Sequence, residues 1–268
     1  MKKAFIIFFL ITNITLLFSV NDNKSADAPS LGYGGASVAS NHSFSGYNNQ
    51  ALLTMLESTT VATSYFQNFS VYDVRVMAGV PLTFGTLGFN VSRLGTHNYA
   101  EYKFGAAYAR NFGDKFGAAL QADLLSVLPS PVEKTAYLFT AELGLWYKPI
   151  EDLTIGFHVY NFINAKYKML YFRERVPVNV KLGLNYSILN NFLVTAEVEN
   201  SSIYGTAVRG GLEYKLLNQV VFRAGGGSNP VLASIGVGVI LKNINIDIAG
   251  QAVRYIGKTG AISLSYAF

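Results

Sequence analysis

The chain has 268 residues, of which half are hydrophobic and only 14% are charged, and its mean hydropathy is +0.27. This composition is too apolar for an ordinary soluble domain. Two of the five net positive charges lie on Lys2 and Lys3, so the rest of the chain is too weakly basic to indicate nucleic acid binding. The absence of cysteine excludes disulfides and thiolate metal sites.

An apolar stretch preceded by two lysines opens the chain. It covers residues 4–20 and is interrupted by Thr12, Asn13 and Thr15. The stretch is too short and too polar for a membrane-spanning helix, and the pattern is typical of a secretory leader. We predict that residues 1–20 are a signal peptide and that the protein is exported.

Residues 21–58 are rich in Asn, Ser, Gly and Ala and show no sustained alternation. The pair Gly34-Gly35 does not belong to a phosphate-binding loop, because no Gly-Lys-Ser/Thr follows it and no β-α-β unit surrounds it. Residues 51–56 can form a single helical turn. We expect residues 21–58 to be a segment distinct from the strands that follow.

From residue 59 onward, short alternating segments are separated by turn residues. No run there approaches the roughly 18 apolar residues of a spanning helix, so only a closed sheet lets this chain satisfy its backbone in lipid. The region 59–268 is therefore predicted to be all-β, a transmembrane antiparallel β-barrel of about 14 strands that each cross the bilayer. The expected strands are 59–66, 71–80, 84–94, 100–112, 115–127, 134–148, 153–163, 177–188, 191–200, 205–216, 219–227, 232–242, 244–255 and 260–268.

Several of these strands are apolar on one face and polar or charged on the other. A basic side chain facing lipid at the membrane centre costs about 2–4 kcal/mol, so the charges are expected to face the lumen. Both signs occur in similar number, which favours a paired network filling the interior, while a conduction path or ligand site stays open as the alternative. The predicted lumen polar network contains Asp73, Arg75, Glu142, Lys181, Glu197, Glu199, Arg209, Glu213, Arg223 and Asp247.

The connections sort by length. If both termini lie on the periplasmic side, the connections at 112–115, 149–152, 189–190 and 242–243 are tight turns on that side. The longest connection, 164–176, then lies on the outer side, which is the asymmetry expected of such barrels.

That long connection is unusually apolar for a solvated loop. Its large side chains either pack back into the barrel mouth or meet a partner such as another outer-membrane or secreted protein, and the sequence favours neither. The predicted partner-contact residues are Tyr167, Met169, Tyr171 and Phe172.

The last strand alternates clearly. Ile262, Leu264, Tyr266 and Phe268 fall on one side, and small or polar residues fall on the other. We expect this strand to close the barrel by pairing with the first one, so that no sheet edge is left in the bilayer. Tyr266 and Phe268 would then lie in the aromatic girdle at the membrane interface.

The sequence offers little for catalysis. Its only histidines, His42, His97 and His158, are far apart, and no hydrolase or paired metal-ligand motif is present. A hydrolase site made of one His and one Ser would leave no sequence motif, because the fold and not the order of the residues in the chain brings them together. We predict a protein that is not an enzyme and that uses no cofactor or metal.

Two short motifs carry a resemblance to a known family. The chain contains Gly34-Gly35-Ala36-Ser37 and then Asn48-Asn49-Gln50-Ala51. With the strands, they resemble the FadL-like outer-membrane barrels, whose members usually show Gly-Gly-Ala followed by Asn-Pro-Ala. Because Gln50 stands where that proline would be, the chain looks closer to the PorV/PorQ-type branch associated with type IX secretion.

The resemblance implies that the segment 21–58 enters the lumen of the barrel as a plug, with Gly34, Gly35, Asn49 and Gln50 as its motif residues. It also implies that the aromatic Phe268, with Tyr266, is read as an insertion signal by the assembly machinery of the outer membrane.

Two functions follow from these expectations. The first is a plugged accessory subunit that binds partner proteins in an outer-membrane secretion or assembly complex. The alternative, which the FadL resemblance implies, is a transporter or channel for small hydrophobic molecules. Both place the protein in the lipid of the outer membrane of a Gram-negative cell.

Overall fold

The computed structural model describes residues 21–22, 26–68, 71–128, 134–167 and 175–268. The predicted signal peptide, residues 1–20, lies outside the described residues. So do Met169, Tyr171 and Phe172 of the predicted contact loop. Within the described part of the chain, no helix is long and apolar enough to cross a membrane.

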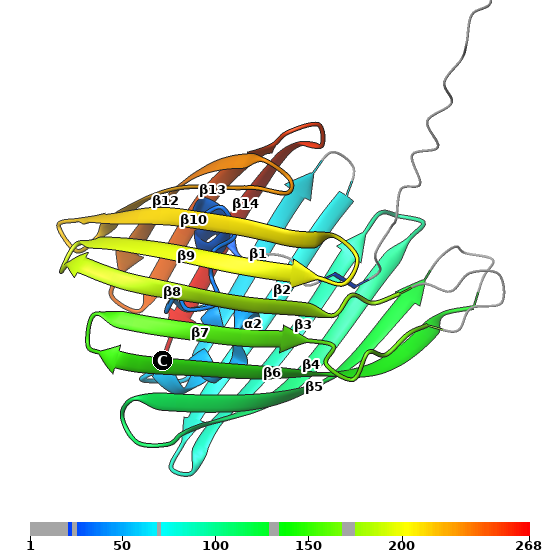
Figure 1. Cartoon of the computed structure of the whole chain (residues 1–268), viewed down its shortest axis with the longest axis horizontal. Coiled ribbons are helices and arrows are strands. Elements are labelled where there is room, and N and C mark those ends of the chain that lie inside the picture. Colours follow the sequence, from blue (N-terminus) through cyan, green and yellow to red (C-terminus); the bar gives the residue numbers. More distant parts are fainter. Residues whose placement is uncertain (1–20, 23–25, 69–70, 129–133, 168–174) are drawn as a thin grey trace, which may run out of the picture.

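Fourteen antiparallel strands form a closed barrel in which each strand pairs with its neighbours in the sequence (Figure 1). The predicted barrel is thus confirmed, and the strand ends differ from the expected ones by up to three residues. The strands are β1 (Thr60–Asn68), β2 (Val71–Leu82), β3 (Gly85–Gly95), β4 (Ala100–Asn111), β5 (Phe116–Leu128), β6 (Ala136–Ile150), β7 (Leu153–Tyr160), β8 (Asn179–Leu189), β9 (Phe192–Ser201), β10 (Gly205–Leu216), β11 (Val220–Gly227), β12 (Leu232–Leu241), β13 (Ile244–Val253) and β14 (Gly257–Ala267).

The two ends of the barrel differ in the length of their connections. What we call the turn end holds the start of β1, the C-terminal Phe268 and the even-to-odd connections, which contain two to four residues each. The opposite end, which we call the loop end, holds the odd-to-even connections, including the longest one, between β7 and β8. In Figure 1 the turn end lies at the left, where the C-terminus is marked.

The barrel closes between its first and last strands, as the sequence predicts. Pairs of opposite residues run from Thr60 and Ala267 to Gln67 and Gly260. The backbone N–H of Phe268 extends the pairing by donating to the carbonyl of Thr59 at 2.9 Å. Closure leaves no unpaired strand edge, which is the condition for a sheet to lie in lipid.

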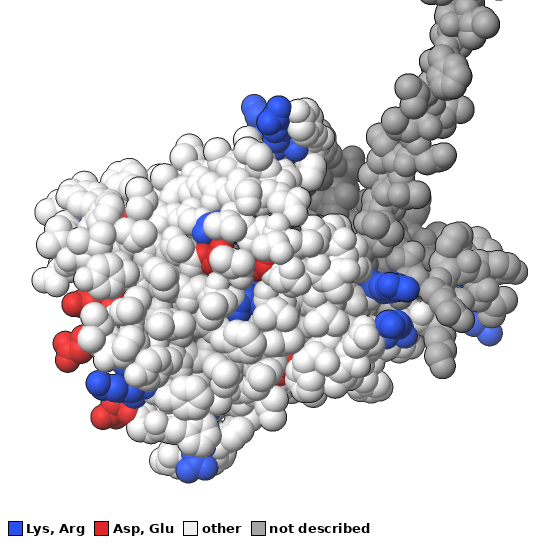
Figure 2. Space-filling view, in the orientation of Figure 1, with Lys and Arg blue, Asp and Glu red and all other residues white. Residues whose placement is uncertain are grey.

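Each strand separates its two faces by burial. In β14, Ser263 and Ser265 are buried inside, whereas Ile262 and Leu264 are 46% and 47% exposed outside. In the view of Figure 2 the outer wall between the two ends is white apart from a small group of charged atoms near its centre. Such an apolar outer band is what a bilayer requires of a barrel.

Residues 26–56 lie inside the barrel, and we call them the interior segment (Figure 1). They contain two short helices and a 3₁₀ helix, and almost all of their side chains are buried. The predicted helical turn at 51–56 is present as the 3₁₀ helix. These elements are α1 (Ala28–Gly32), α2 (Ser45–Asn48) and η1 (Gln50–Met55).

Inward-facing glycines make room for the backbone of the interior segment. A Cβ atom added at Gly225 would lie 2.2 Å from the carbonyl carbon of Tyr33, and one at Gly156 would lie 2.2 Å from the carbonyl oxygen of Val38. No side chain fits at such a distance. The wall therefore meets the segment by direct contact of backbones.

Candidate functional site in the barrel interior

Glu142 of β6 is the centre of a dense group of polar contacts. Its side chain is completely buried and forms an ion pair with Lys103 of β4. His158 of β7 lies 2.8 Å from it, and the side-chain amide of Gln50, in the interior segment, donates to it at 2.7 Å. Because an unpaired buried carboxylate is costly, these contacts stabilise Glu142 and also attach the segment to the wall.

Glu197 of β9 holds the interior segment by its backbone. One carboxylate oxygen accepts hydrogen bonds of 2.8 Å from the N–H groups of both Ser37 and Val38. Next to them, the hydroxyls of Ser40 and Thr195 lie 3.4 Å apart. Since hydrogen bonds to a charged acceptor are stronger than neutral ones, Glu197 is a firm attachment point.

A third attachment lies nearer the turn end. The hydroxyl of Tyr33 donates to Glu213 at 2.5 Å, and Arg223 bridges Glu213 at 2.8 Å and Asp247 at 2.6 Å. Burial, together with the nearby Glu213 carboxylate, raises the pKa of Tyr33 above its ordinary value. The hydroxyl of Tyr33 therefore stays protonated and remains a donor.

The other predicted lumen residues also point inwards. Asp73 and Arg75 form an ion pair at 2.5 Å, and Arg209 and Glu199 form another at 2.5 Å. Lys181 is buried opposite His158 on the neighbouring strand. These positions favour the paired network over a path lined by unpaired charges. The functional role of the ten residues stays a prediction.

The four motif residues lie where the interior segment turns. Gly34 and Gly35 have φ values of +74° and +95°, which favour glycine. The side chain of Asn49 caps η1 and donates to the carbonyl oxygens of Val38 at 2.9 Å and Leu145 at 3.0 Å. Asn49 therefore links two parts of the segment to the wall beside Gln50.

The aromatic residues that were predicted to make contacts differ in exposure: Tyr167 is buried, whereas Tyr266 and Phe268 are exposed. Tyr167 is only 2% exposed, and its hydroxyl accepts a hydrogen bond of 3.1 Å from Asn21. For this residue the loop packs back into the barrel mouth, so its assignment as a partner contact is corrected. Tyr266 and Phe268 are exposed, with their rings in edge contact at 4.8 Å, and their role as an insertion signal stays a prediction.

The pair formed by Asp27 and His42 was not foreseen from the sequence. Their side chains lie 3.0 Å apart inside the barrel, and Asp27 also accepts hydrogen bonds from Ser30 as the N-cap of α1. Burial opposes ionisation of Asp27, but His42 and Ser30 outweigh it and hold the pKa of Asp27 below its ordinary value. The sequence Asp-Ala-Pro at 27–29 is an N-cap pattern that could have marked α1.

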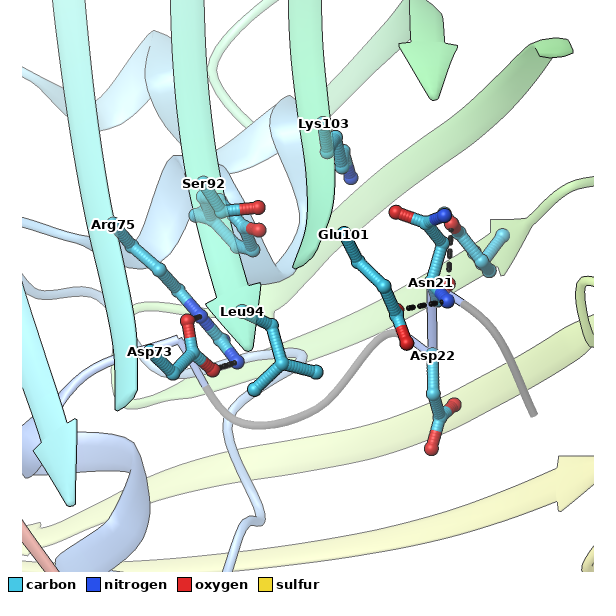
Figure 3. A pocket seen from close by; sticks show the side chains of 10 residues that line it. Asn21, Asp22, Asp73, Arg75, Ser92, Leu94, Glu101 and Lys103 are labelled. Atoms are coloured by element: carbon cyan, nitrogen blue, oxygen red, sulfur yellow. Dashed lines mark hydrogen bonds and ion pairs between the residues drawn. The ribbon is translucent and has the colours of Figure 1, made fainter. Parts of the chain in front are cut away.

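Cavities lined by described residues lie beside the interior segment towards both ends of the barrel. The one near the loop end has a volume of about 30 Å³, and Figure 3 shows Asp73 and Arg75 directed at each other and Glu101 directed at Asn21 within it. It has room for little more than a water molecule. The one near the turn end has a volume of about 180 Å³, and its lining includes Phe44 and Leu264.

No group of three His, Cys, Asp or Glu side chains that could hold a metal ion occurs among the residues that the structure describes. The three described histidines have separate environments. His158 contacts Glu142, His42 contacts Asp27, and His97 is exposed at the loop end.

Comparison with known proteins shows the fold. No family model and no curated protein matches the chain. The solved structure of the Pseudomonas putida toluene transporter TodX matches with a TM-score of 0.67 and 12% identity over 94% of this chain and 100% of that one. The Ralstonia pickettii toluene transporter TbuX matches with a TM-score of 0.65 and 12% identity over 91% of this chain and 99% of that one.

A Pseudomonas aeruginosa FadL homologue matches with a TM-score of 0.65 and 11% identity over 91% of this chain and 98% of that one. The chain therefore has the barrel fold of FadL-like proteins, as the resemblance implied. The PorV/PorQ branch stays a prediction. Two of these three structures are named toluene transporters.

Proposed function

We propose that this protein is an outer-membrane channel for small hydrophobic molecules, without enzymatic activity, whose lumen is closed by the interior segment as a plug. The apolar outer wall and the closed sheet suit lipid. The predicted leader would direct the chain out of the cytoplasm. The solved barrels of the same fold that are named toluene transporters support hydrophobic cargo.

The observation that carries the proposal is the way in which the interior segment is attached. The fourteen strands pair only with one another, and the segment is held through Glu142, Glu197, Glu213 and other side chains. Its release would break side-chain contacts but no strand pairing. The segment can therefore move while the barrel stays closed to lipid.

The larger cavity is big enough for the proposed cargo. An apolar cavity of about 150 Å³ binds benzene, and the cavity near the turn end measures about 180 Å³. Apolar side chains of Phe44, Val221 and Ile240 line part of it. Much of the remaining lining is polar or charged. Arg223 is paired with Glu213 and Asp247, and Asp27 is paired with His42, which lowers the cost of these groups beside an apolar molecule.

The test is to lock the interior segment in place. Ser40→Cys with Thr195→Cys puts a thiol pair where the hydroxyls are 3.4 Å apart, and the natural chain has no other cysteine. Uptake of labelled toluene by cells carrying the oxidised variant should fall to the level of cells without the protein, and a reductant should restore it. The two single-cysteine variants are the controls.

Two results would count against the channel. Equal uptake by oxidised and reduced protein would show that the segment need not move. Uptake by wild-type cells no faster than by cells lacking the protein would show that toluene is not cargo.

A second candidate is the plugged accessory subunit of a secretion or assembly complex, of the PorV/PorQ kind. The interior charges favour it, because ion pairs such as Lys103–Glu142, Arg209–Glu199 and Arg223–Asp247 each join two strands of the barrel. Charges paired in this way fill the lumen instead of lining an open path. A steady conductance of the intact protein in a planar bilayer would count against it. A protein partner that is recovered by affinity purification, and released by Tyr171→Ser with Phe172→Ser, would favour it over the channel.

A further inference from the structure

Exposed charges are distributed unequally between the two ends of the barrel. Among the described residues, every exposed acidic side chain lies at the turn end, where exposed basic side chains also occur. The exposed charges that the structure describes at the loop end are all basic, while Glu133, Lys168, Arg173 and Glu174 of the same connections lie outside the described residues. The exposed acidic side chains are Glu57, Asp114, Glu151 and Asp152, and the exposed basic ones at the loop end are Lys134, Lys166, Arg175, Arg254 and Lys258. Figure 2 shows blue at the upper edge and, beside the grey residues that are not described, at the right, and red mixed with blue at the left.

One basic group lies on the hairpin between β13 and β14. Arg254 and Lys258 flank Tyr255 and Ile256, which are 90% and 58% exposed. The guanidinium of Arg254 stacks 4.7 Å from the centre of the Tyr255 ring. A large apolar tip beside two cations is suited to the boundary between headgroups and acyl chains, because the ring enters the boundary while the cations meet phosphate.

The other basic group lies across the barrel. Lys166 and Arg175 are paired directly opposite each other in a short bridge within the connection from β7 to β8. Like charges in opposite positions destabilise such a pair unless an anion lies between them. In the ring of fourteen strands the hairpin between β13 and β14 is six strands away from this connection, so the two groups lie on roughly opposite sides of the barrel.

We propose that the loop end is a binding surface for phosphorylated lipid headgroups of the outer leaflet. Phosphate oxygens accept hydrogen bonds from Lys and Arg and neutralise their repulsion. Groups on opposite sides of the rim match a leaflet that surrounds the barrel, whereas a single protein partner would match one side. The inference rests on the proposed place in the outer membrane but not on transport.

The test compares lipid retention by matched variants. Full-length protein in phosphatidylcholine nanodiscs is given bis-phosphorylated lipid A or its dephosphorylated form, and the lipid that stays bound is measured by native mass spectrometry. A basic side chain near an anionic leaflet contributes about fivefold in affinity. Arg254→Gln with Lys258→Gln should thus weaken binding at its own group about 25-fold, which removes about half of the bound phosphorylated lipid, and Lys166→Gln with Arg175→Gln should do the same at the other group.

Arg110→Gln with Lys242→Gln removes two exposed bases at the turn end and should leave retention unchanged. Equal retention of both lipids by the wild type would overturn the proposal, and so would an equal loss in the turn-end control. Excess inorganic phosphate should not displace the lipid; full displacement would assign the surface to free phosphate instead. Failure to enter nanodiscs would count against the membrane location itself. Toluene uptake is measured in a separate assay, so that failure of the channel proposal can be told apart from failure of this one.

Discussion

Glu197 attaches the interior segment through two backbone amides, so its removal leaves both amides buried without an acceptor. Glu197→Ala should weaken docking of the segment by about 2–4 kcal/mol. Hydrogen exchange at Ser37 and Val38 should then speed up while exchange in the strands stays slow. Glu199→Ala is the control, since Glu199 pairs with Arg209 and not with these amides; an equal effect of both variants would contradict the assignment.

The Asp27–His42 pair predicts a dependence on acid. Because the pKa of Asp27 is lowered in the folded protein, its contribution is fully present above the ordinary value of 3.8 and is lost as the pH falls from there through the folded pKa. Exchange protection of α1 should thus decrease below about pH 4. In Asp27→Asn this decrease should be absent, and a decrease of the same size in that variant would assign it to another group.

The interior glycines predict a contrast at the scale of a strand. At Gly225 a Cβ atom would meet the backbone of Tyr33, whereas at the outward-facing Gly250 nothing lies within 4 Å. Gly225→Ala should therefore displace the segment at a cost of about 1–3 kcal/mol and expose it to protease. Gly250→Ala should behave like the wild type. A protected segment in Gly225→Ala would show that the contact can relax without loss.

The strands could be predicted from the sequence, because alternation and turn residues are local signals. Their ends were less certain. The seventh strand stops at Tyr160 instead of 163, since Asn161 takes a positive φ of 53°, and the last begins at Gly257 because it pairs as far as Val253. Alternation alone does not encode either feature.

From its residues alone the interior segment was predictable only as a region of different composition, and its place in the lumen was implied by the resemblance to FadL-like barrels. It has no periodicity, and its contacts join residues far apart in sequence, such as Gln50 and Glu142 or Ser37 and Glu197. The inward positions of the charges followed from the cost of facing lipid. Which of them bind the segment depends on where its backbone runs, and inward glycines such as Gly156 and Gly225 are local traces of that path.

For the whole molecule, the closing strand decides whether the barrel can lie in a membrane. Without β14, the facing edges of β1 and β13 would leave backbone groups unpaired in lipid, at several kcal/mol for each group. Deletion of residues 257–268 should abolish the compact, heat-modifiable form of the protein in isolated outer membranes. This deletion tests closure of the barrel, whereas Phe268→Ser tests the terminal aromatic ring.

Phe268→Ser should reduce insertion without removing the strand. Phe268 contributes an exposed ring in edge contact with Tyr266, and its backbone bond to Thr59 does not depend on the side chain. The expected loss thus belongs to the ring, either at the membrane interface or in recognition during assembly. Phe112→Ser removes another exposed aromatic from the same end, so it separates the two causes. Equal loss in both variants would assign the effect to the girdle, and loss in Phe268→Ser alone would assign it to recognition of the C-terminal residue.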